Sequence, residues 1–154
     1  LAMEYMAWLW REKLPIVIAR PFNYTGVGQA AHFLLPKIIK HFKEKAPRIE
    51  LGNLHVRRDY SDVRSVATAY RKLVECPEAK GAINVCSGNA YSVHEVLEMV
   101  SEISGHTLEV AVNPDFVRAG EVELLYGSRE KLEKTVGPIE WIPLRDTLRW
   151  MLGT

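Results

Sequence analysis

Two short, mostly apolar runs constrain the fold of this chain more than any other feature: residues 16–19 (Ile-Val-Ile-Ala) and residues 82–86 (Ala-Ile-Asn-Val-Cys). Runs of this kind are typical of strands buried on both faces of a parallel sheet. Stretches with helical periodicity lie between and after them, so the sequence predicts a mixed α/β fold. The parallel strands are too few for a complete doubly wound domain.

The spacing of apolar residues places the other elements. We expect helices at residues 1–13, 33–43, about 65–75, 93–104, 128–135 and 144–152, and short strands at residues 49–51, 108–112 and 123–125. The fourth helix has the clearest boundaries, because Ser92 and Glu95 form a capping box and Gly105 ends it. Residues 20–28 are expected to leave the first strand as a loop.

The first helix starts without a capping Ser, Thr, Asp or Asn. The simplest interpretation is that the sequence enters a helix in its middle, so that the chain is a fragment of a longer protein. An uncapped, frayed terminus is the alternative, but it leaves Trp8 and Trp10 without cover. We therefore expect residues 1–154 to be one portion of a larger enzyme.

The bulk properties exclude several classes of partner. The chain has 154 residues and a net charge of +1, which gives no basis for binding nucleic acid or an anionic membrane. No apolar run approaches the roughly 20 residues of a membrane span. Cys76 and Cys86 do not suggest a disulfide framework, and the five histidines have no metal-ligand spacing. We expect no metal, no signal peptide and a cytoplasmic location.

The most informative motif is Arg-Arg-Asp-Tyr-Ser-Asp-Val-Arg-Ser-Val at residues 57–66, expected at a strand-to-helix junction. Arginines present a fixed fork that matches phosphate or carboxylate. The alternative is that Arg58 pairs with Asp59 or Asp62 and only ties the junction. The motif resembles the R-D-[YF]-x-[DH]-V-x-D-V-A element of extended short-chain dehydrogenases. In that family the matching arginine binds the diphosphate of a sugar nucleotide, so the resemblance implies this role for Arg58. Ser65 replaces the usual Asp, and both residue types can cap the following helix.

Two further motifs resemble the same family. Residues 20–23 (Arg-Pro-Phe-Asn) resemble its R-x-F-N element, which implies that Asn23 lies against the diphospho-sugar rather than only stabilising a turn. Residues 116–128 resemble its R-P-x-[DE]-V segment, with Ala119 in place of Pro. Arg118 would then be a second diphosphate-binding arginine, or else a surface arginine, and Glu121 would accept from a ribose hydroxyl.

The resemblance also assigns residues near the base and the cofactor. It implies that Lys37 lies near the nucleotide base, although a solvated helix lysine is the alternative, and that Pro21 and Tyr24 contact the cofactor. The Gly-x-Gly-x-x-Ala at residues 26–31 is not read as a dinucleotide fingerprint, because six residues separate it from the preceding strand.

The catalytic machinery of the family is missing from this sequence. Its Tyr-x-x-x-Lys pair would lie upstream of the first strand, and no tyrosine here is followed by lysine four positions on. NAD(P) would be bound mainly by an N-terminal Rossmann half that is absent. We therefore assign no catalytic residue and expect the fragment to be inactive alone.

The resemblance implies a fold and a function. The fold would be the C-terminal part of an extended Rossmann-type short-chain dehydrogenase: the last parallel strands plus the smaller mixed α/β substrate-binding domain. The motifs look most like GDP-6-deoxy-4-keto-mannose reductases, with GDP-mannose 4,6-dehydratases close by. Dehydratases carry His where Tyr24 stands, which favours the reductase. Another nucleotide-sugar epimerase or dehydratase, a non-catalytic nucleotide-sugar binding module and an inert fragment are the alternatives. We expect a GDP-sugar partner and a homodimer.

Overall fold

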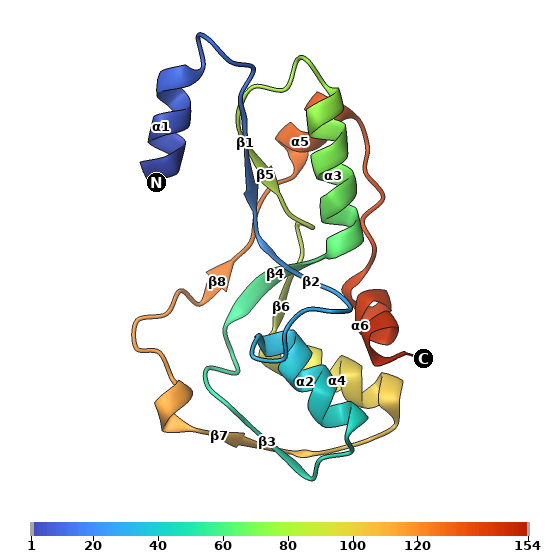
Figure 1. Ribbon diagram of the computed structural model, residues 1–154. Helices are drawn as coiled ribbons and strands as arrows, with labels where there is room; N and C mark the ends of the chain where they lie inside the picture. The colour runs from blue at the N-terminus through green and yellow to red at the C-terminus, as the bar shows by residue number, and fades with distance from the viewer. Residues whose placement is uncertain (1, 154) are drawn as a thin grey trace.

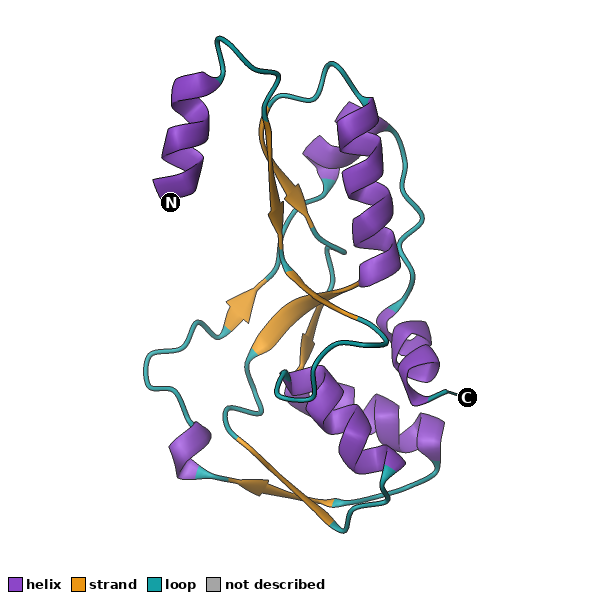
Figure 2. Cartoon of the chain, viewed as in Figure 1, coloured by secondary structure: helices purple, strands orange, loops and turns teal. Residues whose placement is uncertain are grey.

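The computed structural model describes residues 2–153, so Leu1 of the expected first helix lies outside the described residues. The chain forms an elongated α/β structure in which a two-stranded unit continues into a larger mixed unit (Figures 1 and 2). The elements in chain order are α1 (Ala2–Trp10), β1 (Val17–Pro21), β2 (Asn23–Thr25), α2 (Leu34–Lys43), β3 (Arg48–Leu51), β4 (Arg57–Asp62), α3 (Val63–Glu75), β5 (Gly81–Val85), β6 (Ala90–Ser92), α4 (Val93–Ser104), β7 (Glu109–Val112), the 3-10 turn η1 (Pro114–Phe116), β8 (Leu124–Leu125), α5 (Glu130–Val136) and α6 (Leu144–Leu152).

The smaller unit is built on the two apolar runs. β1 and β5 pair in parallel, and α3 and α5 cover one face of the pair (Figure 1). Ile83 and Val85 of β5 are fully buried, but β1 is only half-buried. The prediction that both faces of β1 are buried is therefore wrong for this chain. The reason is visible in the packing, since α1 stands apart on the other side and none of its residues is buried.

The larger unit is organised around β4. β4 pairs antiparallel with β6 along one side, and on its other side it pairs in parallel with β8 and then with β2. Residues 57–62 form a strand rather than only the predicted junction, and residues 20–25 lie largely in β1 and β2 rather than in the predicted loop. The hydrophobic pattern does not predict β4, because its buried residues include the polar side chains of Asp59, Ser61 and Asp62.

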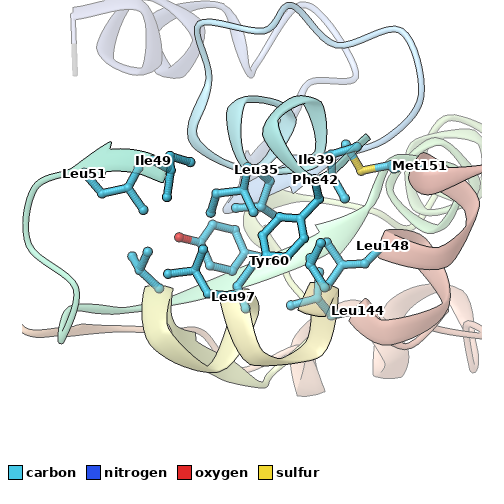
Figure 3. Close-up of a cluster of buried hydrophobic side chains, with 14 of the residues drawn as sticks. Leu35, Ile39, Phe42, Ile49, Leu51, Tyr60, Leu97, Leu144, Leu148 and Met151 are labelled. Carbon is cyan, nitrogen blue, oxygen red and sulfur yellow. The ribbon is translucent and has the colours of Figure 1, made fainter. Parts of the chain in front are cut away.

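The main hydrophobic core lies under this sheet. α2, α4 and α6 pack against one another and against β4. The ring of Tyr60 lies between side chains of α2 and α4, with Leu35 and Phe42 on one side and Leu97 on the other (Figure 3). β3 and β7 form a separate parallel pair that extends this core at its outer edge. The expected edge strand near residues 108–112 is thus confirmed.

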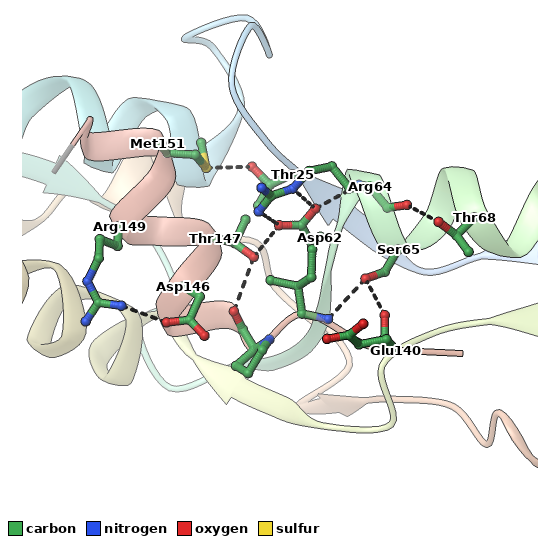
Figure 4. Close-up of polar contacts among 12 residues, drawn as sticks. Thr25, Asp62, Arg64, Ser65, Thr68, Glu140, Asp146, Thr147, Arg149 and Met151 are labelled. Carbon is green, nitrogen blue, oxygen red and sulfur yellow. Dashed lines mark hydrogen bonds and ion pairs between the residues drawn. The ribbon is translucent and has the colours of Figure 1, made fainter. Parts of the chain in front are cut away.

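A buried carboxylate joins β4 to α3 and α6. Asp62 caps α3 by accepting from the backbone N–H of Arg64 at 2.7 Å, and the Thr147 hydroxyl of α6 donates to its other oxygen at 2.7 Å (Figure 4). Burial alone would raise the pKa of Asp62, but the hydrogen bonds and charge of Arg64, with the bond from Thr147, outweigh it and hold the pKa below 3.8. Ser65 does not cap α3, because it lies within the helix and its hydroxyl bonds the segment before α6, donating to the Glu140 carbonyl and accepting from the Ile142 N–H.

The predicted boundaries of α4 are confirmed. Ser92 and Glu95 form the capping box of α4, and Gly105 ends that helix with a positive φ of 65°. Trp141 packs against the smaller core, as expected. Among the helices of residues 2–153, none has the length and hydropathy needed to cross a membrane.

We predict that Asp62→Asn destabilises the chain by about 2–4 kcal/mol at neutral pH, because the amide cannot accept from both Arg64 and Thr147. A lowered pKa means that this stabilisation is present above the ordinary value of 3.8 and is lost as the pH falls below it. Urea denaturation at several pH values measures the difference. Asp146→Asn is the control, since the Asp146 carboxylate pairs with Arg149 at the surface. If the difference in unfolding free energy between the unsubstituted chain and Asp62→Asn does not become smaller in acid, the stabilising role of the Asp62 carboxylate is contradicted.

Candidate functional site

A cleft with two arginines and a glutamate in its lining lies between β2, β4, the start of α2 and the loop that precedes β8. Its volume is about 560 Å³. The residues that line it are Phe22, Asn23, Tyr24, Thr25, Gln29, Phe33, Leu34, Leu35, Pro36, Val56, Arg58, Tyr60, Arg118 and Glu121. Five of the seven residues predicted from the sequence therefore meet at one cleft, although they come from three separate segments: Asn23, Tyr24, Arg58, Arg118 and Glu121.

Arg58 is the central cation of the cleft. Its guanidinium donates from Nη2 to Glu121 at 2.8 Å and from Nη1 to the carbonyl of Arg57 at 2.9 Å. Its side chain is only 12% exposed. The alternative in which Arg58 pairs with Asp59 or Asp62 is wrong, because Asp59 accepts from Ser87 and Gly88 while Asp62 is taken by Arg64 and Thr147.

The strand geometry of β4 separates the two neighbouring arginines. Side chains alternate between the faces of a strand, so Arg58 and Tyr60 line the cleft together, whereas Arg57 points away from it. Arg57 pairs with Glu95 at 2.8 Å and also bonds the carbonyl of Ala90. The second arginine of the cleft is instead Arg118, which comes from a distant part of the sequence.

Contacts with the segment after β3 hold the loop that carries Arg118. The backbone N–H of Arg118 donates to the side chain of Asn53 at 2.9 Å, and the Asn53 amide donates back to the Arg118 carbonyl at 3.2 Å. Next to it, the carbonyl of Phe116 lies so near Gly52 that an added Cβ would be 2.1 Å from the oxygen. The loop position thus depends on glycine at residue 52.

β2 brings Asn23 and Tyr24 to the cleft through its parallel register with β4, in which Asn23 is opposite Tyr60. Tyr60 was not predicted as a site residue, although it occupies the aromatic position of the R-D-[YF] motif. Burial raises its pKa to about 12, while the charge of Arg58 lowers it and that of Glu121 raises it. The Tyr60 hydroxyl therefore stays protonated at neutral pH and can donate a hydrogen bond.

Two predicted residues lie outside the cleft lining. Lys37 donates from Nζ to the carbonyl of Glu50 at 2.7 Å and sits 4.8 Å from the centre of the Phe116 ring. Lys37 is therefore next in sequence to Pro36 of the cleft lining, but its ammonium group points toward β3. Pro21 ends β1 opposite Val85 and is exposed. Their expected roles near the base and the cofactor stay predictions.

The chemistry of the cleft is that of anion binding against an apolar wall. The charged side chains in its lining are Arg58, Arg118 and Glu121. Two guanidiniums suit a diphosphate, since charge-assisted bonds from arginine are short and directional. Phe33, Leu34 and Leu35 add an apolar surface next to this polar floor. The arrangement can bind and orient an anionic ligand with a flat or apolar part.

Comparison with known sequences gives a consistent result. The profile of the family described as GDP-mannose 4,6 dehydratase matches residues 1–151. The GDP-6-deoxy-D-talose 4-dehydrogenase of Aggregatibacter actinomycetemcomitans is 35% identical over 88% of this chain and 46% of its own length. The GDP-6-deoxy-D-mannose reductase of Pseudomonas aeruginosa is 32% identical over 99% of this chain and 53% of its own length. The chain thus spans about half the length of these curated relatives.

Solved structures share the fold. A Burkholderia cenocepacia J2315 protein, named only provisionally as an epimerase, is 56% identical with a TM-score of 0.96, over 99% of this chain and 50% of that one. The protein RMD of Pseudomonas aeruginosa, complexed with NADPH, is 30% identical with a TM-score of 0.88, over 97% of this chain and 52% of that one. The fold expected from the sequence, the C-terminal part of an extended short-chain dehydrogenase, is confirmed.

We predict that Gly52→Ala destabilises the chain by about 1–3 kcal/mol, because its Cβ forces the backbone of Phe116 away. Hydrogen exchange should report faster exchange of the Arg118 amide, since that amide is bonded to Asn53. Asn53→Ala is the comparison variant: it removes the same bond without a clash, so it should loosen Arg118 at a smaller cost. Unchanged exchange at Arg118 in Gly52→Ala contradicts the prediction.

Proposed function

The chain belongs to the GDP-mannose 4,6 dehydratase family of extended short-chain dehydrogenases, and from this we propose that it is the nucleotide-sugar binding half of an NAD(P)-dependent oxidoreductase. The substrate we propose is GDP-4-keto-6-deoxy-mannose, which the enzyme reduces. The names of two relatives support this choice, since both concern GDP-6-deoxy sugars. Tyr24, in the position where dehydratases of the family carry His, also favours the reductase.

The observation that carries the proposal is the meeting of Arg58 and Arg118 at one cleft with Glu121. The two guanidiniums would neutralise the two negative charges of a diphosphate. Glu121 would accept a hydrogen bond from a ribose hydroxyl, and Asn23 would contact the diphospho-sugar from β2. The apolar wall at Phe33 would then face the nucleoside, with Lys37 beyond it near the base.

Binding in this half would fix the sugar for a reaction completed elsewhere in the protein. NAD(P)H would supply the hydride, and an N-terminal Rossmann half would hold most of it. Pro21 and Tyr24 fit an edge contact with that cofactor, because Pro21 is exposed at the end of β1 and Tyr24 is exposed in the middle of β2. Holding the diphosphate at two arginines restricts the position of the attached sugar, which is how binding residues contribute to rate.

The exposed face of α1 supports a larger assembly. Met3, Trp8 and Leu9 are 85%, 45% and 66% exposed, which is unusual for large apolar side chains gathered on one helix. The proposal therefore includes an N-terminal cofactor half and a homodimer of the whole protein. We also propose, as expected from the sequence, a cytoplasmic location.

We predict that this chain binds GDP-mannose in calorimetric titration, and binds it more tightly than UDP-glucose. Arg58→Ala and Arg118→Ala should each weaken binding about 30-fold or more, the scale of about 2 kcal/mol for a charge-assisted bond. Arg71→Ala is the control, because the Arg71 guanidinium pairs with Glu75 at the surface and does not line the cleft. Folded variants that bind like the unsubstituted chain would refute the diphosphate site.

A second candidate activity is dehydration of GDP-mannose, which the description of the matching family favours. The two activities use different substrates, so the full-length protein that carries this chain separates them. We expect consumption of NADPH or NADH with GDP-4-keto-6-deoxy-mannose and no formation of a keto-sugar from GDP-mannose. The opposite result would assign the dehydratase.

A further inference from the structure

Arg58 and Glu121 form an ion pair and are the least exposed of the charged residues that line the cleft. The two side chains meet at 2.8 Å and are only 12% and 22% exposed. Ion pairs with so little solvent contact are weakly screened by salt. Glu121 therefore occupies the guanidinium that a diphosphate needs, and any anion that approaches Arg58 meets a carboxylate already bound there.

The charges of the cleft lining determine how strongly a phosphate group at Arg58 is repelled. With Glu121 ionised, the lining side chains carry two positive charges from Arg58 and Arg118 and one negative charge. A phosphate group at Arg58 would lie close to the Glu121 carboxylate, and like charges at such distances repel strongly in a partly buried site. A ligand needs hydrogen-bond donors directed at Glu121 to offset this repulsion. A ribose diol offers two neutral hydroxyl donors, whereas inorganic pyrophosphate near neutral pH is a multiply charged anion with few protons to donate.

On the basis of the proposed function, we propose that Glu121 is a specificity-determining residue that excludes phosphate-only anions from the cleft. Its carboxylate competes with them for Arg58, while a nucleoside diphosphate compensates through its ribose hydroxyls. Discrimination of this kind comes from a repulsive element directed against the unwanted ligand, together with an attractive one for the wanted ligand. The chain thereby binds nucleotide-linked diphosphates in the presence of free pyrophosphate and phosphate.

The surroundings of Arg58 allow this idea to be tested cleanly. The bond from Nη1 to the Arg57 carbonyl and the pairing of β4 with β6 and β8 position Arg58 independently of Glu121. Glu121→Gln keeps the size of the side chain and an oxygen that accepts from Arg58, but removes the charge. Glu123→Gln is the matched control, because Glu123 is exposed and contacts Arg57 only through its backbone carbonyl.

The experiment is calorimetric titration of the chain and both variants with inorganic pyrophosphate and with GDP, after circular dichroism has verified that each is folded. We expect Glu121→Gln to bind pyrophosphate about tenfold more tightly than the unsubstituted chain, because the substitution removes the repulsion between the carboxylate and the anion. Its affinity for GDP should gain less or fall, because the ribose loses its charged acceptor. The preference for GDP over pyrophosphate should then drop at least tenfold, and Glu123→Gln should leave it unchanged.

The inference is overturned if Glu121→Gln gains no affinity for pyrophosphate, or if it gains equally for both ligands. It is also overturned if Glu123→Gln reproduces the effect, since the cause would then be net charge alone. Failure of the proposed function looks different: the unsubstituted chain would bind neither GDP nor GDP-mannose. In that case the affinities of the unsubstituted chain and of Glu121→Gln for pyrophosphate still show whether Glu121 blocks Arg58.

Discussion

The structure depends on two carboxylates that are buried in strand β4. Asp59 is fully buried and accepts from the backbone N–H groups of Ser87 and Gly88 and from the Ser87 hydroxyl, at 2.7–2.9 Å. Asp62 is equally buried and accepts from Arg64 and Thr147. Burying an ionised carboxylate is costly unless charged or backbone donors surround it, as they do here. The first carboxylate ties the smaller unit to β4, and the second ties β4 to α3 and α6.

The same strand explains how the cleft is assembled. Because β4 is fixed on both sides, the alternation of its side chains directs Arg58 and Tyr60 toward one face and Arg57 and Asp59 toward the other. The first face becomes the floor of the cleft, and the second makes the structural contacts. One short polar strand thus holds the two units together and presents the central cation of the proposed site.

Much of the fold could be predicted from the sequence, because periodicity and caps act locally. The α4 capping box at Ser92 and Glu95 is an example, and so is the end of that helix at Gly105. β4 could not be predicted in the same way. Its burial comes from partners that lie far along the chain, so its residues look like a polar loop. The motif spacing still marked Arg58, but it gave no indication that Arg57 would face away from the cleft.

What the sequence by itself determined is the family, the order of the elements and the separate motifs that hold Asn23, Arg58 and Arg118, because each of these is written in contiguous residues. Only the tertiary structure decided which of them share a cleft. Glu121 reaches Arg58 across 63 positions of sequence, and the Gly52–Phe116 approach places the loop between them. Contacts of that kind arise from packing and strand register, which no local pattern specifies.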